Sequence, residues 1–176
     1  MNDQIDESRE PDCRRIWVIR HAKSSWAIVR QNDFDRPLNE RGNRNGLQMQ
    51  TWLSGQSHGA TWLWTSNAVR AVATSQYVGN GFALTAEQIV ENDSLYGGSA
   101  EATLAVLRQT PRGISNVAVV AHNPGLTRLV NKLTGNYVTD NLPTFGIARL
   151  TTPAPWQDLQ FGQCLLEVLV SPKKLN

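Results

Sequence analysis

Short apolar runs alternate with longer amphipathic runs along most of the chain. The apolar runs are rich in Val, Ile, Trp and Ala, and most are only three to six residues long, which is typical of strands covered on both faces. The predicted strands are 16–19, 61–65, 88–90, 117–121, 146–151 and 163–170. The last two, separated by a Pro-rich connection, are expected to form an antiparallel pair.

The segments between these runs repeat their apolar residues at helical spacing. The predicted helices are 40–54, 67–78, 99–109 and 125–133. Their ends carry helix signals: Gly55 follows the first helix, Ser66 stands where an N-cap of the second is expected, and Pro111 ends the third.

Alternating strands and helices predict an α/β fold in three layers, with a mainly parallel twisted sheet and helices on both faces. We interpret residues 1–13 as a flexible N-terminal tail, because they are polar and acidic, and residues 14–176 as one domain. The long polar loop 26–39 is the segment best suited to act as a lid.

Composition narrows the possible partners. The net charge of +2 is too small to indicate a nucleic-acid partner. The start of the chain has no apolar core typical of a signal peptide, and no apolar run reaches the ~18 residues that a membrane span needs. Cys13 and Cys164 are far apart and are expected to be free thiols. The sequence therefore predicts a cytoplasmic protein with no membrane partner.

Cationic and imidazole side chains follow three of the predicted strands. Arg20 and His21 come directly after the first strand, Arg70 lies one helical turn beyond the second, and His122 follows the strand 117–121. Because the carboxyl ends of parallel strands meet at one edge of a sheet, we expect these four side chains to converge there.

Such a cluster suits a phosphoryl group. Two guanidinium groups offer forked donors that match phosphate oxygens, and a helix N-terminus adds backbone N–H groups. Phosphoryl transfer mainly requires positioning and charge neutralisation. One imidazole could act as the nucleophile while the other stabilises the developing charge.

Other interpretations of these residues are weaker. Metal binding by His21 and His122 lacks a third ligand at useful spacing, and two nearby arginines would repel a cation, so we expect no metal and no other cofactor. Ser66 is interpreted as a helix cap rather than a nucleophile. Arg36 and Arg41 could be solvated surface charges or substrate contacts, and the sequence leaves both alternatives open.

Four segments carry a resemblance to a known family: VIRHAKSSW, RPLNERG, TSNAVRAVATS and VVAHNPGL. In this order they resemble the histidine phosphatase superfamily, and they are most similar to its small, cap-free phosphohistidine phosphatases of the SixA type. The resemblance covers roughly residues 16–150 and implies a phosphoglycerate mutase-like fold. It also implies that His21 is the phosphorylated nucleophile and that Arg20, Arg70 and His122 bind the phosphoryl group.

The proton donor is less clearly marked. Members of the superfamily often have a Glu shortly before Tyr-Gly-Gly, and here Asp93 stands three residues before Tyr96, with Glu91 two residues earlier. A second family arrangement places an Asp after the late histidine, but this chain has Asn123 there. Asp93 is therefore the candidate general acid, with Glu91 or no acid as the alternatives.

Together these observations predict a metal-independent phosphatase that works through a phosphohistidine intermediate. The resemblance favours a phosphorylated protein, carrying phosphohistidine, as the substrate, and the short chain leaves little material for a cap over the pocket. Two alternatives remain. One is a phosphomonoesterase for a small phosphorylated metabolite, and the other is a phosphate-dependent binding module without turnover.

Overall fold

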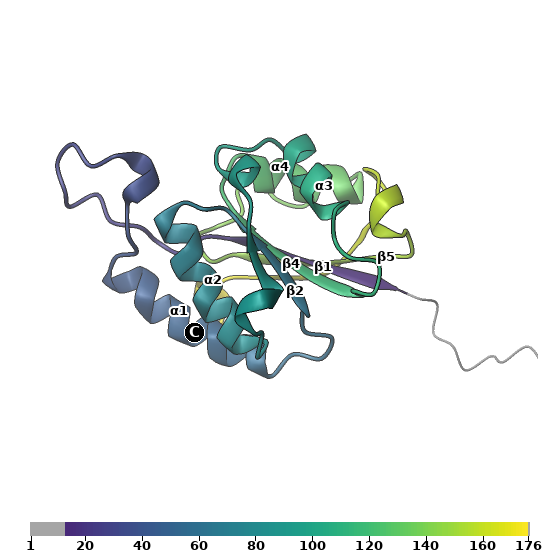
Figure 1. Cartoon of the computed structure of the whole chain (residues 1–176), viewed down its shortest axis with the longest axis horizontal. Helices are drawn as coiled ribbons and strands as arrows, with labels where there is room; N and C mark the ends of the chain where they lie inside the picture. Colours follow the sequence, from purple (N-terminus) through teal and green to yellow (C-terminus); the bar gives the residue numbers. More distant parts are fainter. Residues whose placement is uncertain (1–12, 176) are drawn as a thin grey trace, which may run out of the picture.

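The computed structural model describes residues 13–175, which form one sheet between two layers of helices (Figure 1). The strands are β1 (Arg14–Arg20), β2 (Trp62–Thr65), β3 (Ile89–Glu91), β4 (Asn116–Ala121), β5 (Ile147–Thr152) and β6 (Leu165–Val170). Their order across the sheet is β3-β2-β4-β1-β5-β6. Strands β1 to β4 are parallel, and β5 is antiparallel to both of its neighbours. The predicted fold class is confirmed, while the predicted tail lies outside the described residues except for Cys13.

Two helices cover each face of the sheet. The α-helices are α1 (Glu40–Ser54), α2 (Val69–Gly81), α3 (Ala100–Leu107) and α4 (Gly125–Thr134). Short 3-10 turns join them: η1 (Asp33–Asp35), η2 (Ala86–Gln88), η3 (Asp93–Leu95), η4 (Trp156–Asp158) and η5 (Pro172–Lys174). Helices α1 and α2 pack together on one face, and α3 and α4 pack together on the other. All four predicted helices are present.

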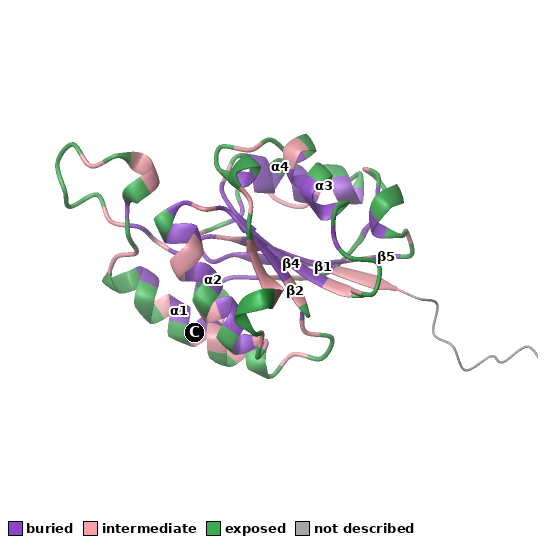
Figure 2. Ribbon diagram, in the orientation of Figure 1, coloured by how far each residue is buried: buried purple, intermediate pink, exposed green. Residues whose placement is uncertain are grey.

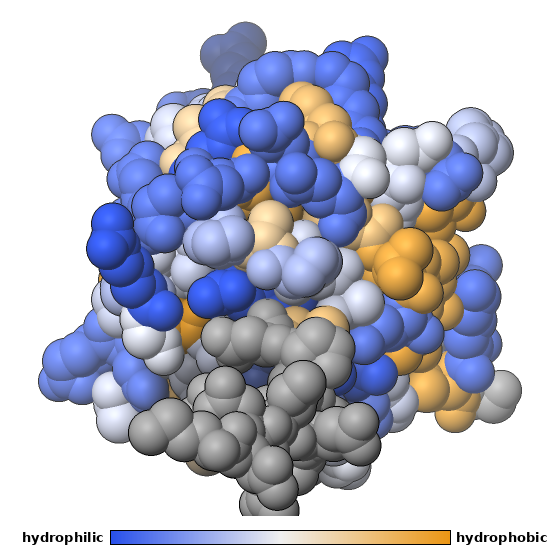
Figure 3. Space-filling model, turned by 90° about the vertical axis from the view of Figure 1, so that its right-hand side faces the viewer, coloured by the Kyte–Doolittle hydropathy of each residue, from blue (hydrophilic) through white to orange (hydrophobic). Residues whose placement is uncertain are grey.

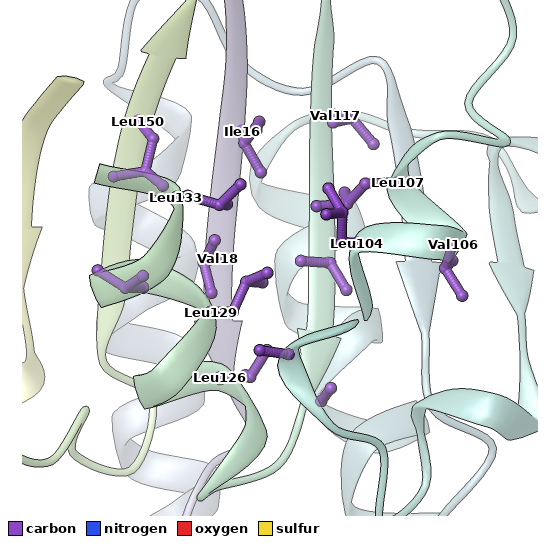
Figure 4. Packing of buried hydrophobic residues seen from close by; sticks show 14 of the residues in the cluster. Ile16, Val18, Leu104, Val106, Leu107, Val117, Leu126, Leu129, Leu133 and Leu150 are labelled. Atoms are coloured by element: carbon purple, nitrogen blue, oxygen red, sulfur yellow. The ribbon is translucent and has the colours of Figure 1, made fainter. Parts of the chain in front are cut away.

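The alternation of side chains along the strands explains the two layers. In β1, Ile16 and Val18 belong to the core beneath α3 and α4, whereas Trp17 and Ile19 belong to the core beneath α1 and α2. All four are fully buried. Figure 2 shows that the central strands are buried along most of their length, and Figure 4 shows α4 residues such as Leu129 packed against the sheet. A strand buried on both faces needs a continuous apolar run, which is the pattern seen in the sequence.

The parallel strands deliver their carboxyl ends to one rim of the sheet. The loop between β1 and α1 leaves from this rim and projects to the left in Figure 1. The opposite end, where β1 begins, faces the viewer in Figure 3 and is mainly hydrophilic apart from a hydrophobic area at one side. Cys13 and Cys164 are both free thiols. Between residues 13 and 175, no helix is both long and apolar enough to cross a membrane.

Helix α2 begins later than predicted. Its N-cap is Ala68, which makes no side-chain capping bond, and the first helical residue is Val69. The prediction that Ser66 caps this helix is therefore wrong. The chain passes Ser66 in an extended course because its N–H still continues the sheet ladder by donating to the Val120 carbonyl at 2.9 Å.

Candidate active site

His21 lies at the carboxyl end of β1 and is fixed through its backbone. Its N–H donates to the Ala121 carbonyl of the neighbouring strand at 3.1 Å, and its own carbonyl accepts from Phe145 N–H at 3.2 Å. The side chain is buried, and its Nδ1 lies 2.7 Å from the Ala22 carbonyl. A carbonyl can only accept, so Nδ1 carries the proton and Nε2 is left with its lone pair.

Arg70, in the first turn of α2, faces that lone pair. Its Nε donates to Nε2 of His21 at 3.3 Å. The arginine is buried, and its remaining donors point toward the loop between β1 and α1. Because a cation near a helix N-terminus is electrostatically unfavourable without an anion, Arg70 indicates a place for negative charge.

His122 follows β4, which lies between β2 and β1 in the sheet. Its ring centroid is 5.0 Å from that of His21. Its Nε2 forms a 2.8 Å hydrogen bond with the hydroxyl of Ser66, the residue after β2. Its Nδ1 is buried and has no hydrogen-bond partner within residues 13–175. If the Ser66 hydroxyl donates, Nδ1 carries the proton and is a free donor.

Arg20 closes the other side of the site. Its Nη1 donates to the Leu142 carbonyl at 2.8 Å and contacts Asn141 Oδ1 at 3.4 Å. Asn123 supports the same loop, because its Nδ2 donates to Asn141 Oδ1 at 2.8 Å and to the Leu142 carbonyl at 2.9 Å. The Nε of Arg20 is buried without a partner in the described structure.

The loop between β1 and α1 places a carboxylate among these cations. Oδ2 of Asp33 accepts from Arg70 Nη2 at 3.0 Å and from the Tyr96 hydroxyl at 2.9 Å. Oδ1 accepts from Arg36 Nε at 3.0 Å. Arg36 is buried and lies 3.6 Å from the centroid of the Trp26 ring, which is largely exposed at the mouth of the site.

The electrostatics keep both histidines neutral. Burial lowers the pKa of His21 to about 3, partly opposed by its bond to the Ala22 carbonyl and reinforced by His122, when that ring is protonated, and by the charge of Arg70. Burial and Arg70 lower the pKa of His122 to about 4. For Asp33, burial alone would raise the pKa, but the bonds from Tyr96 and Arg36 and the charge of Arg70 lower it to about 2.

The resulting cavity has a volume of about 330 Å³ and lies at the rim of the sheet. It is lined by Arg20, His21, Lys23, Ser24, Trp26, Asp33, Arg36, Arg70, His122, Asn123 and Thr144. Cations and neutral imidazoles therefore surround a space whose sole lining carboxylate is Asp33. Among residues 13–175, no three His, Cys, Asp or Glu side chains are grouped so as to hold a metal ion.

The sequence and the fold can be compared with known proteins. The family model of the histidine phosphatase superfamily (branch 1) matches residues 16–95. A candidate phosphohistidine phosphatase SixA from Nakamurella multipartitia is 25% identical, with a TM-score of 0.80 over 91% of this chain and 96% of the other. The protein histidine phosphatase SixA in complex with tungstate is 24% identical, with a TM-score of 0.78 over 92% of this chain and 99% of the other.

An uncharacterized protein of Mycobacterium tuberculosis is 28% identical over 156 residues, which is 82% of this chain and 93% of that protein. The predicted resemblance to the histidine phosphatase superfamily, and to its SixA-like branch, is confirmed. The family-model match and the SixA-like structures support a phosphatase activity for this chain.

The structure brings together Arg20, His21, Arg70 and His122 around this cavity, as the strand-end argument predicts. It does not bring Asp93 to them. Asp93 is exposed on η3, and it is not among the residues that line the cavity. The same is true of Glu91, which ends β3 with an exposed side chain.

Asp33 and Ser66 are not predicted as site residues from the sequence, whereas Arg36 is predicted to be either a surface charge or a substrate contact. Asp33 was counted only as part of a polar loop, and Ser66 was assigned to a helix cap. Arg36 could have been a surface charge, but it is buried, so that alternative is wrong. The available signal was the RPLNERG segment, because it places Arg36 inside a family motif. Arg41 is exposed, which is compatible with both alternatives.

Proposed function

We propose that this chain is a metal-independent phosphatase that hydrolyses phosphohistidine on a protein, through a phosphorylated His21. The observation that carries the proposal is a cavity in which Nε2 of His21 is unprotonated and faces Arg70, while the one lining carboxylate, Asp33, is ionised.

His21 is prepared as the nucleophile by its surroundings. The bond from Nδ1–H to the Ala22 carbonyl directs the lone pair of Nε2 into the cavity side that Arg70 faces. With a pKa of about 3, the ring is neutral at physiological pH and needs no base to remove a proton. On substrate binding, Arg70 Nε exchanges its contact with Nε2 for a phosphoryl oxygen.

Three groups bind the phosphoryl oxygens. Arg70 and Arg20 supply guanidinium donors, including the unpartnered Nε of Arg20. His122 supplies its Nδ1–H, with the opposite nitrogen held by Ser66. Donors fixed in advance stabilise the charge on the equatorial oxygens without reorganisation in the transition state.

The reaction has two displacement steps. In the first, the lone pair of His21 Nε2 forms a bond to phosphorus while the bond from phosphorus to the substrate nitrogen breaks. The departing electron pair stays on that nitrogen, and because the other ring nitrogen of the substrate carries a proton, a neutral imidazole leaves. In the second, a water oxygen attacks phosphorus, the bond to Nε2 breaks, and the water proton passes to solvent. The products are inorganic phosphate and the free His21 imidazole.

The leaving group favours phosphohistidine over an alkyl phosphate. Asp33 is the carboxylate in the cavity, and its pKa of about 2 leaves it without a proton to donate. An alkoxide leaving group needs such a proton, whereas the nitrogen of phosphohistidine departs readily. The exposed Trp26 at the mouth also leaves the cavity accessible to a side chain on a protein surface.

The test is phosphate release from a phosphohistidine-bearing protein in the presence of a chelator. Wild type should turn over, and His21→Ala should not. A series of aryl and alkyl phosphate esters with rising leaving-group pKa should show a steep fall in rate. Asp93→Asn is expected to follow the wild-type series because its side chain does not line the cavity, while Asp33→Asn tests the carboxylate that does.

The outcomes separate the alternatives. Turnover of small esters without turnover of the phosphoprotein would keep the chemistry and reject the substrate. Loss of activity in the presence of chelator would reject the metal-independent mechanism. If Asp93→Asn slowed the hydrolysis of esters with poor leaving groups and spared the others, Asp93 would be the general acid after all. Binding of phosphohistidine without release of phosphate would identify a binding module.

A further inference from the structure

A second cavity opens beside the candidate active site. Its volume is about 340 Å³, and it shares Arg20, Lys23 and Thr144 with the first cavity. The other side of this space is formed by the start of α1, with Arg41, and by η5, with Lys173. We call it the side pocket. Its size lies within the range of about 300–1,000 Å³ that is usual for ligand sites.

The side pocket concentrates positive charge. Four of its lining residues are cations, namely Arg20, Lys23, Arg41 and Lys173, and none is acidic. The whole chain has a net charge of only +2, so this region is far more basic than the average surface. In the described part of the chain, no carboxylate pairs with any of these four. Their mutual repulsion is relieved when an anion enters.

Arg20 connects the two cavities. Its Nη1 is held by the Leu142 carbonyl, while its buried Nε has no partner within residues 13–175. A buried donor left unpaired is costly, and the phosphoryl group that we assign to it would bring the rest of the substrate to the edge of the side pocket. Polar groups suited to an anion line the rest of the pocket, among them the buried Ser171 and the half-buried Asn45.

We propose that the side pocket binds a second anionic group, a carboxylate or a phosphate, of the same substrate that presents its phosphoryl group to His21. The proposal rests on the proposed function and narrows its substrate class to molecules with two neighbouring anionic groups. An acidic side chain next to the phosphorylated residue of a protein is the favoured source, because Arg41 and Lys173 are exposed and reachable from a protein surface. A small metabolite with two anionic groups is the other source.

The first arm of the test uses two phosphohistidine peptides that differ in one neighbour, Glu or Gln. Wild type should prefer the Glu peptide about tenfold in kcat/KM, and 0.5 M salt should reduce this preference because the cations are partly exposed. The double variant Arg41→Gln/Lys173→Gln should lower the preference to about twofold. Equal preference in this variant and in wild type would overturn the proposal.

The chain offers a matched control. Arg44→Gln/Lys174→Gln removes one arginine from α1 and one lysine from η5 at nearby positions that do not line the side pocket. It should keep the tenfold preference. If both double variants lose the preference equally, general attraction by positive charge explains it and the side pocket is rejected.

The second arm identifies the source of the anion. A phosphorylated hydroxy acid is compared, in the same variants, with the analogue in which its carboxylate is replaced by a neutral amide and its phosphoryl group is kept. If the enzyme prefers the acid over the amide but does not distinguish the two peptides, the pocket is assigned to a metabolite. Absence of discrimination in both pairs overturns the proposal.

Binding separates this inference from the proposed function. Non-hydrolysable phosphonate analogues of the Glu and Gln peptides are titrated into the full chain and into the two double variants. A preference for the Glu analogue that only the Arg41/Lys173 change removes would support the side pocket even if no peptide were hydrolysed. Equal affinities for both analogues would reject it even if turnover were rapid.

Discussion

Asp33 binds Arg70 twice, through its backbone and through its side chain. Arg70 Nη1 donates to the Asp33 carbonyl at 2.6 Å, and Nη2 donates to the Asp33 carboxylate at 3.0 Å. The third donor, Nε, is directed at His21. In the free protein, the loop between β1 and α1 therefore satisfies an arginine that we assign to the phosphoryl group, and an incoming anion must compete with it.

Removing the charge of Asp33 should strengthen the binding of free phosphate. In Asp33→Asn, we expect the inhibition constant of inorganic phosphate to fall about tenfold, because like charges held close together oppose binding. Asp35→Asn is the matched control, since Asp35 is exposed in the same turn. Weaker phosphate binding in Asp33→Asn would show instead that the carboxylate positions Arg36 and Arg70 for the substrate.

Ser66→Ala should reduce the rate more than the affinity. The hydroxyl orients His122, and its loss leaves both ring nitrogens of that histidine without a protein partner. We expect kcat to fall about tenfold with a smaller change in KM, and the free energy of unfolding to fall by about 1–3 kcal/mol. Ser75→Ala is the control, because Ser75 is equally buried but binds Thr65 rather than a histidine. An unchanged kcat in Ser66→Ala would refute the orienting role.

Stability should depend on pH through His21 and His122. Their pKa values in the folded protein are about 3 and about 4, well below the ordinary value of 6.5. Between pH 6.5 and pH 4 the unfolded chain therefore binds protons that the folded chain does not, so the free energy of unfolding falls as pH falls. The slope is up to about 1.4 kcal/mol per pH unit for each histidine.

Urea denaturation at pH 7.5, 5.5 and 4.5 measures this dependence. The double variant His21→Asn/His122→Asn should lose much less stability over the range than wild type. His58→Asn should behave as wild type, because His58 is an exposed loop residue. A wild-type loss that persists in the double variant would assign the dependence to other groups.

The approach of α1 to the first loop predicts a sharp difference between two glycines. A Cβ on Gly42 would collide with the backbone carbonyl of Lys23, whereas a Cβ on Gly55 would only touch the Trp52 carbonyl at 3.6 Å. Gly42→Ala should cost about 1–3 kcal/mol by thermal or urea unfolding. Gly55→Ala should change stability by less than about 0.5 kcal/mol. Equal costs would mean that the loop can move away.

The part of the site that lies on strands could be predicted from the sequence. Arg20, His21 and His122 directly follow apolar runs, and parallel strands with continuous apolar runs leave their carboxyl ends at one rim. Their convergence then follows from the fold class alone. The sheet order was not predicted, because short buried strands carry no signal for their neighbours.

The part of the site that lies on loops could not be predicted in this way. Asp33 reaches the cavity because Arg36, Arg70 and Tyr96 hold it, and such contacts between distant segments leave no periodicity in the sequence. The Tyr96 segment did indicate the right neighbourhood. It favoured Asp93 because that residue is near in sequence, while the carboxylate that Tyr96 contacts is 63 residues away.

The reversed direction of β5 has a consequence for how this protein can change. Because β6 runs parallel to β1, the turn η5 returns to the rim, so Lys173 lines the side pocket from a segment outside the parallel strands. Arg41 and Lys173, which we assign to substrate choice, therefore lie on other elements than His21, Arg70 and His122, which we assign to bond making. Exchanging residues 171–174 between relatives should alter which substrates are accepted while the phosphoryl-transfer groups stay in place, so selectivity can diverge without rebuilding the chemistry.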